Sequence, residues 1–267
     1  MGKLENGLQF TGTVGLFSAY RMKDSDEIRV RARRSRSGKK VKELQPRVQE
    51  NISEFMLSSY AAGAIRHCLR DIRHLATFNF TPKLTSLSRK IQKLDPVSAR
   101  GQRNVLISQH PSYFAGFDLN RKNTFDSIIR HPLQYSIDPV KGIALIQLPD
   151  LIQGVSVFLP WPVPQYRVLI SLNLVADQLY NEANKKECFS VMPAMATTDW
   201  IPSNQPRESQ GFELTLPAPA VKPAMARLTY VLSIGIEWEI VTLKNGGGMI
   251  RTGAGKIIDM MAMEESV

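Results

Sequence analysis

Residues 227–243 read RLTYVLSIGIEWEIVTL and residues 249–263 read MIRTGAGKIIDMMAM, which places two long apolar runs late in the sequence. Between them stands Lys244-Asn-Gly-Gly-Gly248. Asparagine followed by glycine is the pair that tight β-hairpin turns favour. The two runs are therefore predicted to form a long antiparallel hairpin.

Shorter runs rich in Val, Ile, Leu and Phe precede this hairpin, and Pro or Gly residues separate them. They cover residues 142–148, 155–159, 166–175, 188–192 and 211–216. Strand-length runs with turn signals at this spacing are typical of two packed antiparallel sheets, with about seven strands in roughly a hundred residues. Residues 131–267 are therefore predicted to form an immunoglobulin-like β-sandwich domain.

The preceding part, residues 44–130, is predicted to be a helical region. In residues 44–78, apolar residues recur at intervals that place them on one face of a helix. They are Val48, Ile52, Phe55, Ala62, Ile65, Leu69, Ile72 and Ala76. A second helix is expected to begin with Thr81 as its N-cap and to end before Pro96. A shorter third helix is expected from there to about Ile107.

Residues 1–43 are predicted to be a basic β-arm. Residues 8–34 have the alternation of a β-hairpin, and the segment from Ile28 to Lys42 holds eight basic residues and no acidic one. The segment begins with apolar residues that alternate with arginines, which is the period of a strand. A lone hairpin is only marginally stable in water. The arm is therefore expected to dock on its own body or on a neighbouring molecule.

The net charge of +10 is concentrated in the first half of the chain. Residues 1–47 carry 12 basic and 5 acidic residues, residues 48–130 carry 12 and 6, and residues 131–267 carry 10 and 13. This asymmetry is expected of a protein that holds an anionic partner at one end, and nucleic acid and an acidic protein are equally good candidates. The alternative is an arm that serves only solubility.

The basic side chains expected to contact this partner fall into two groups. One group belongs to the arm, and the other forms a stripe at helical spacing in the middle region. For the stripe, a solvated helix face laced by Asp71 is the competing interpretation. The first group is Arg29, Arg31, Arg33, Arg34, Arg36, Lys39, Lys40 and Lys42, and the second is Arg66, Arg70 and Arg73.

Neither a metal site nor a cofactor is predicted. His67, Asp71 and His74 form a neighbouring stripe, but nearly two helical turns, about 10 Å, separate the two histidines, which is too far to share one ion. Gly253-Ala-Gly-Lys256 resembles the end of a phosphate-binding loop but lacks the first glycine and the following Ser or Thr.

The sequence favours a protein that is not an enzyme. An active site would require scattered residues that converge in a polar pocket.

Trp161, Trp200 and Trp238 are assigned to packing within the β-rich region. Stacking of nucleobases on aromatic side chains needs basic surroundings, and residues 131–267 are acidic on balance. The alternation around Trp238 is interpreted as placing its ring with the two flanking glutamates rather than with the nearby isoleucines. Cys68, within the first helical pattern, is expected to be a small buried hydrophobic residue.

The first residues lack the apolar core of a secretory signal peptide, and no run reaches the roughly 18 apolar residues of a membrane span. A cytoplasmic product without a membrane partner is therefore expected.

Several short motifs occur in an order that resembles a known family. They are Gly12-Thr-Val-Gly15, Tyr20-Arg-Met-Lys23, Ile28-Arg-Val-Arg31, Gln45 with Gln49, Gly235-Ile-Glu-Trp238 and Leu243-Lys-Asn-Gly246. With helices followed by a β-sandwich, this order resembles a domain-of-unknown-function family common in Bacteroidota genomes and in their phages and mobile elements. Met22 stands where that family usually has an aromatic residue. Asp24 or Ser25 stands where it has a turn glycine. The resemblance implies the architecture and a phage or mobile-element setting, and it brings no catalytic residues.

The sequence thus predicts an α+β protein with an N-terminal β-hairpin arm, a helical middle segment and a C-terminal immunoglobulin-like β-sandwich. The expected function is that of a non-enzymatic structural or assembly protein of a phage or mobile-element particle, whose arm contacts neighbouring subunits or packaged nucleic acid. The expected partners are further copies of this chain or other proteins of the particle. The expected location is the virion or the cytoplasm. The alternative is a sequence-independent nucleic-acid-binding protein whose affinity falls steeply with salt.

Overall fold

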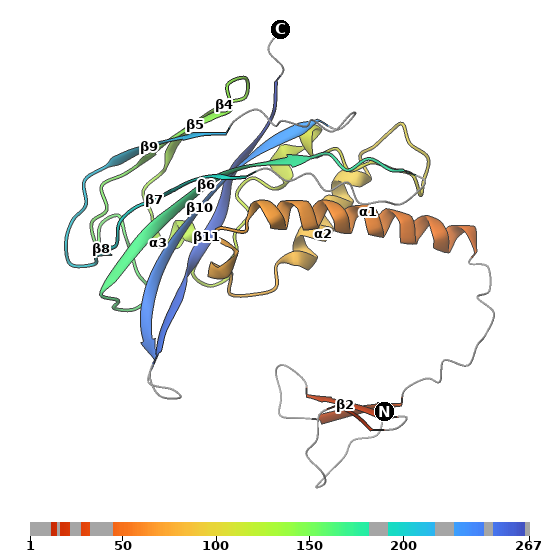
Figure 1. Ribbon diagram of the computed structural model, residues 1–267, viewed down its shortest axis with the longest axis horizontal. Helices are drawn as coiled ribbons and strands as arrows, with labels where there is room; N and C mark the ends of the chain where they lie inside the picture. Colours follow the sequence, from red (N-terminus) through yellow and green to blue (C-terminus); the bar gives the residue numbers. More distant parts are fainter. Residues whose placement is uncertain are drawn as a thin grey trace. The chain divides into compact units, whose positions relative to one another are not determined.

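The computed structural model describes residues 12–14, 17–21, 28–32, 45–181, 192–216, 227–242 and 248–264. The protein is a mixed α+β structure in which strands predominate (Figure 1). The chain divides into two compact units, Met1–Gln45, here called the arm, and Pro46–Val267, here called the body. The helical and β-rich regions expected from the sequence both contribute to the body, because their side chains share a hydrophobic core.

The arm contains the predicted β-hairpin together with one further strand. Strands β1 (Gly12–Val14), β2 (Phe17–Arg21) and β3 (Ile28–Ala32) form an antiparallel sheet in the order β1-β2-β3. The alternation that predicted a strand from Ile28 onward is confirmed.

The larger sheet of the body is built around the long C-terminal hairpin. Its order is β11-β10-β6-β7, and β8 pairs with β6 beside β7. All pairs are antiparallel, and a β-bulge between Leu232 and Ser233 shifts the register of β10 against β11. The strands are β6 (Gln165–Ala176), β7 (Ala194–Thr197), β8 (Ile201–Pro202), β10 (Leu228–Thr242) and β11 (Gly248–Ala262). The predicted runs 166–175, 227–243 and 249–263 are therefore confirmed as strands.

A smaller antiparallel sheet contains β4 (Gln134–Asp138), β5 (Ile143–Leu148) and β9 (Gln210–Thr215), in the order β4-β5-β9. The predicted runs 142–148 and 211–216 correspond to β5 and β9. The predicted strand at 155–159 is wrong, because only isolated bridges form at Val157. Of the predicted run 188–192, residues 188–191 lie outside the described residues.

The two sheets of the body enclose one hydrophobic core. Alternate side chains of β6 and β10, among them Tyr166, Ile234 and Trp238, pack in the same cluster as Ile146 of β5 and Leu214 of β9. The interpretation that grouped Trp238 with its flanking glutamates is wrong. Positions two apart on a strand share a face, so this ring lies with the isoleucines.

The helical elements precede most of the sheet in sequence. They are α1 (Pro46–Cys68), η1 (Arg73–Leu75), α2 (Thr81–Gln92), η2 (Ile107–Gln109), η3 (Pro111–Tyr113) and α3 (Phe125–Ile128). The second predicted helix is confirmed as α2, but its N-cap is Phe80, and the Asn79 side chain accepts a hydrogen bond from the Thr81 N–H. The predicted third helix is wrong, because a loop organised by Asp95 follows α2. No helix in the described ranges is long and apolar enough to cross a membrane.

The second face of the larger sheet is covered by α1, η1 and the segments that follow. Ile65, Ile72 and Leu75 bury their side chains together with Val231 of β10 and Ile257 of β11. Glycines in the two long strands allow this close approach. A Cβ at Gly235, for example, would lie 2.5 Å from the Leu75 side chain.

Cys68 lies in this helix–sheet interface, and its Sγ donates a hydrogen bond to the Leu174 carbonyl oxygen at 3.4 Å. Burial raises the pKa of the thiol to about 12, so the reactive thiolate is nearly absent at neutral pH. In a Cys188→Ser variant, DTNB should therefore label Cys68 of the folded protein only as fast as the protein unfolds, and rapidly in denaturing urea. Complete labelling of the folded protein within seconds would contradict this expectation.

Candidate assembly surface

The first half of α1 presents an apolar stripe to solvent. Val48, Ile52 and Phe55 follow one another at steps of four and three residues, which places them on one face of the helix, and they are 40%, 49% and 55% exposed. Further along the predicted face, Ala62 and Ile65 are fully buried. The expectation that all these residues face the core is wrong for the first three. Figure 1 shows this half of α1 extending past the strands of the larger sheet.

The opposite side of the same half-helix is tied to the loop that follows α2. Glu50 Oε2 lies 3.4 Å from Arg100 Nε. Glu54 Oε1 accepts a hydrogen bond from the Gly101 N–H at 3.1 Å and lies 3.9 Å from Arg103 Nη1. These contacts orient α1 so that its apolar stripe points away from the loop.

Asp95 holds that loop in shape. Its Oδ1 accepts hydrogen bonds from the N–H groups of Val97 at 3.0 Å and Ser98 at 3.2 Å, and its Oδ2 accepts one from Asn104 at 2.8 Å. Burial by itself raises the pKa of Asp95, but these hydrogen bonds outweigh it and lower the pKa below its ordinary value. The carboxylate therefore stabilises the fold above its unfolded pKa of about 3.9. This stabilisation is lost as the pH falls through the lower pKa of the folded state.

An Asp95→Asn substitution should lower the free energy of unfolding by about 2 kcal/mol at neutral pH. The two hydrogen bonds to Oδ1 become bonds to a neutral acceptor, and the bond from the Asn104 N–H is lost because an amide nitrogen in place of Oδ2 cannot accept it. The difference from the wild type should shrink as the pH is lowered from about 5 to about 3. Urea unfolding followed by circular dichroism at a series of pH values would measure it. A difference that stays constant over this range would contradict the assigned role of the charge.

The arm also exposes aromatic side chains. Phe17 and Tyr20 on β2 are 54% and 46% exposed, whereas Ala19 between them is buried. Of the predicted contact residues of the arm, Arg29 and Arg31 lie on β3, with side chains outside the described part of the structure. The remaining six lie wholly outside the described residues: Arg33, Arg34, Arg36, Lys39, Lys40 and Lys42.

The second group of predicted contact residues does not form one helical stripe, because α1 ends at Cys68. Arg66 is exposed in the last turn of α1, Arg70 follows in a turn, and Arg73 is exposed in η1. Arg70 Nη1 lies 3.2 Å from His67 Nε2. The predicted stripe is thus wrong in geometry, although two of its arginines are exposed basic groups.

The histidines of the neighbouring stripe also diverge. His67 lies beside Arg70, whereas His74 Nε2 lies 2.8 Å from Glu237 Oε1 on β10. Asp71 accepts a hydrogen bond from the Ser171 hydroxyl at 2.8 Å. Within the described ranges, no three His, Cys, Asp or Glu side chains are grouped so as to hold a metal ion.

Beyond η1, the helix-side face of the larger sheet carries charged residues that the sequence did not single out. Arg167 Nε donates a hydrogen bond to Glu237 Oε2 at 2.6 Å, and Arg251 Nε donates one to Glu239 Oε1 at 3.1 Å. The guanidinium carbons of the two arginines lie 4.7 Å and 5.9 Å from the ring centre of Trp200. These five residues are called the arginine–tryptophan cluster below. The acidic balance of residues 131–267 therefore does not describe the immediate surroundings of Trp200, where two arginines accompany two glutamates.

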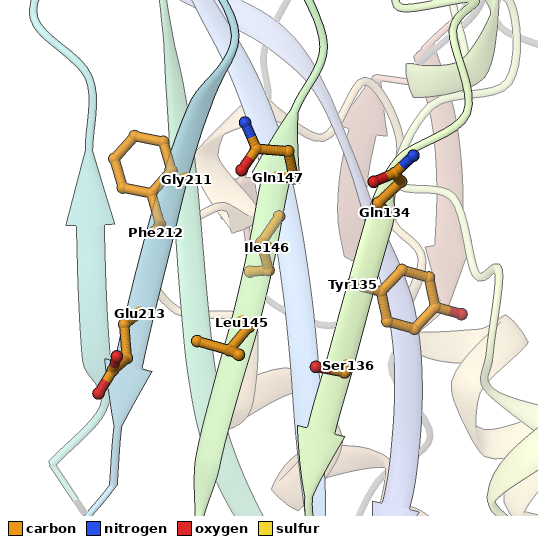
Figure 2. A pocket seen from close by; sticks show the side chains of 9 residues that line it. All are labelled: Gln134, Tyr135, Ser136, Leu145, Ile146, Gln147, Gly211, Phe212 and Glu213. Atoms are coloured by element: carbon orange, nitrogen blue, oxygen red, sulfur yellow. The ribbon is translucent and has the colours of Figure 1, made fainter.

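The outer face of the smaller sheet carries an open hollow of about 490 Å³. Figure 2 shows the side chains that line it on three neighbouring strands. They are Gln134, Tyr135, Ser136, Leu145, Ile146, Gln147, Gly211, Phe212 and Glu213. Glu213 has no histidine, cysteine or second carboxylate beside it in this lining. The hollow therefore lacks the paired groups that acid–base or nucleophilic catalysis uses.

Comparison with protein-family models, with curated proteins and with solved structures gave no match. Function is therefore inferred from the sequence and geometry of this chain.

Proposed function

We propose that the protein is a non-enzymatic structural or assembly protein, whose arm and the start of α1 contact neighbouring subunits. One observation carries this proposal. The apolar stripe of Val48, Ile52 and Phe55 begins directly after an arm that itself exposes Phe17 and Tyr20. Apolar surface of this kind gains free energy when a partner covers it, and a small sheet with little buried apolar surface gains stability from docking. A neighbouring subunit would supply both.

The proposal includes the setting that the family resemblance implies, a particle of a phage or mobile element, with copies in the virion or the cytoplasm. It also includes the immunoglobulin-like class of the β-rich part. Two antiparallel sheets around one hydrophobic core support a sandwich. In such an assembly the arm and the exposed first half of α1 are the parts that contact neighbouring subunits.

Size-exclusion chromatography with light scattering on the nuclease-treated full chain tests this proposal. The wild type should exceed the 30.0 kDa of one chain, and the pair Ile52→Asn and Phe55→Asn should shift it to the monomer mass. Val97→Asn is the matched control, because Val97 is 90% exposed but lies outside α1. A monomeric wild type would reject the proposal, as would an equal shift in the control.

The second candidate is a sequence-independent nucleic-acid-binding protein, favoured by the eight basic residues without an acid in residues 28–42. In that case the protein would be a monomer that carries nucleic acid until nuclease or salt removes it. Six to ten phosphate contacts would lower the affinity by about 10³–10⁵ between roughly 50 and 200 mM salt. An affinity independent of salt would exclude this candidate.

A further inference from the structure

We infer that the arginine–tryptophan cluster is a nucleic-acid contact on the body, which holds the phosphates of a single strand and stacks one of its bases. The inference goes beyond the proposed assembly role and does not depend on the arm. It assigns a ligand class to five residues of the body: Arg167, Trp200, Glu237, Glu239 and Arg251.

The register of the sheet brings the charged groups together. Arg167 on β6 stands opposite Glu237 on β10, and Glu239 stands opposite Arg251 on β11. Each carboxylate is contacted by the Nε of its arginine. Among the described residues, the hydrogen bonds of these two arginines to carboxylates come from Nε and not from the terminal Nη groups. These forked donors match the oxygens of a phosphate group.

The negative charges of the cluster are covered, and the positive ones face solvent. The side chains of Glu237 and Glu239 are 1% and 8% exposed, whereas those of Arg167 and Arg251 are 25% and 56% exposed. His74, which contacts Glu237 from η1, is also accessible. An approaching ligand therefore meets guanidinium groups that buried carboxylates hold in place. This arrangement is preorganised to bind an anion.

The position of Trp200 favours single-stranded nucleic acid over a duplex as the ligand. It is partly exposed between β7 and β8 and lies beside both guanidinium groups. Aromatic side chains next to basic ones are the means by which many proteins bind single strands without sequence preference, and the bases of a duplex are not available for such stacking. An open sheet face offers room for a strand. Without the arm, residues 46–267 carry 23 basic and 19 acidic residues, and this positive balance favours a polyanion over a small anion.

The test uses the full chain and a fluorescein-labelled oligothymidine of about twenty nucleotides, with binding followed by anisotropy at several salt concentrations. Arg251→Gln should weaken binding about fivefold and lower the slope of log K against log salt by about one. Arg207→Gln is the matched control, because it removes the same charge from an exposed arginine bonded to Gln210 at the smaller sheet. Equal affinities of the two variants would overturn the inference.

A second readout reports on the stacked base and does not depend on binding by the arm. Unlabelled oligothymidine should quench the tryptophan fluorescence of the wild type, and Trp200→Phe should abolish this quenching while anisotropy still detects binding. Quenching that persists in Trp200→Phe, or equal quenching by a duplex of the same length, would overturn the stacking. Should Arg251→Gln fail to fold by circular dichroism, the Trp200→Phe result decides.

Discussion

Replacing Gly253 with alanine should destabilise the body by about 3 kcal/mol, the upper end of what overpacking usually costs. Gly253 stands opposite Glu237 in the β10–β11 hairpin. A Cβ at this position would lie 2.0 Å from the Ile236 carbonyl oxygen and 2.9 Å from the Leu75 side chain. The oxygen belongs to the backbone of a paired strand, so no side-chain rotation can relieve the contact. Guanidinium unfolding followed by circular dichroism would measure the loss.

The matched control is Gly63→Ala in the interior of α1. A Cβ there would have no neighbour within 4 Å, and alanine is favoured over glycine in a helix by about 0.5–1 kcal/mol. This variant should therefore be more stable than the wild type. The close approach of η1 to the sheet would be contradicted if both substitutions changed stability in the same direction and by similar amounts.

The sequence predicted strands well where most of a strand is apolar. Much of β6, β10 and β11 is buried on both faces, one by the smaller sheet and the other by the helices, so long apolar runs mark these strands. β4 reads QYSID and has three exposed residues in succession. Its pairing with β5 depends on long-range contacts, and its own sequence carries little strand signal.

The periodicity of apolar residues did not predict where α1 ends. Leu69, Ile72 and Leu75 continue the apolar spacing of the helix, yet they lie in a turn and in η1. They are buried all the same, because the glycines of β10 and β11 let this segment approach the sheet. The spacing correctly indicated burial but not the local conformation. The exposure of Val48 was missed for a related reason, since a periodic pattern does not tell how far along a helix the core extends.

The arginine–tryptophan cluster could not be predicted from the sequence, because its residues lie far apart in the chain. Arg167 and Glu237 are 70 residues apart and meet only through the register of β6 with β10. One local signal was available. In Glu237-Trp238-Glu239, strand alternation places the two acids together on the face opposite the tryptophan, and buried acids require partners. The average acidity of residues 131–267 concealed the two arginines that supply them.

The second large effect concerns the buried ion pair. Arg167→Met should lower the free energy of unfolding by about 3 kcal/mol, because it leaves the buried carboxylate of Glu237 without its arginine partner. Glu237 is 1% exposed, and its remaining contact is His74, whose side chain is 44% exposed. Lys141→Met, which breaks the exposed pair with Asp138 at 4.0 Å, is the surface control and should change stability by about 0.5 kcal/mol or less.

The double variant Arg167→Met and Glu237→Leu should recover most of that loss and come within about 1 kcal/mol of the wild type, because replacing both members of a buried pair by apolar residues removes the uncompensated charge. His74 is exposed enough to be hydrated after Glu237 is gone. Urea unfolding of the single and double variants, followed by circular dichroism, would measure both values. A double variant as unstable as Arg167→Met would show that packing of the arginine side chain, and not the charge of Glu237, determines the stability at this end of the sheet.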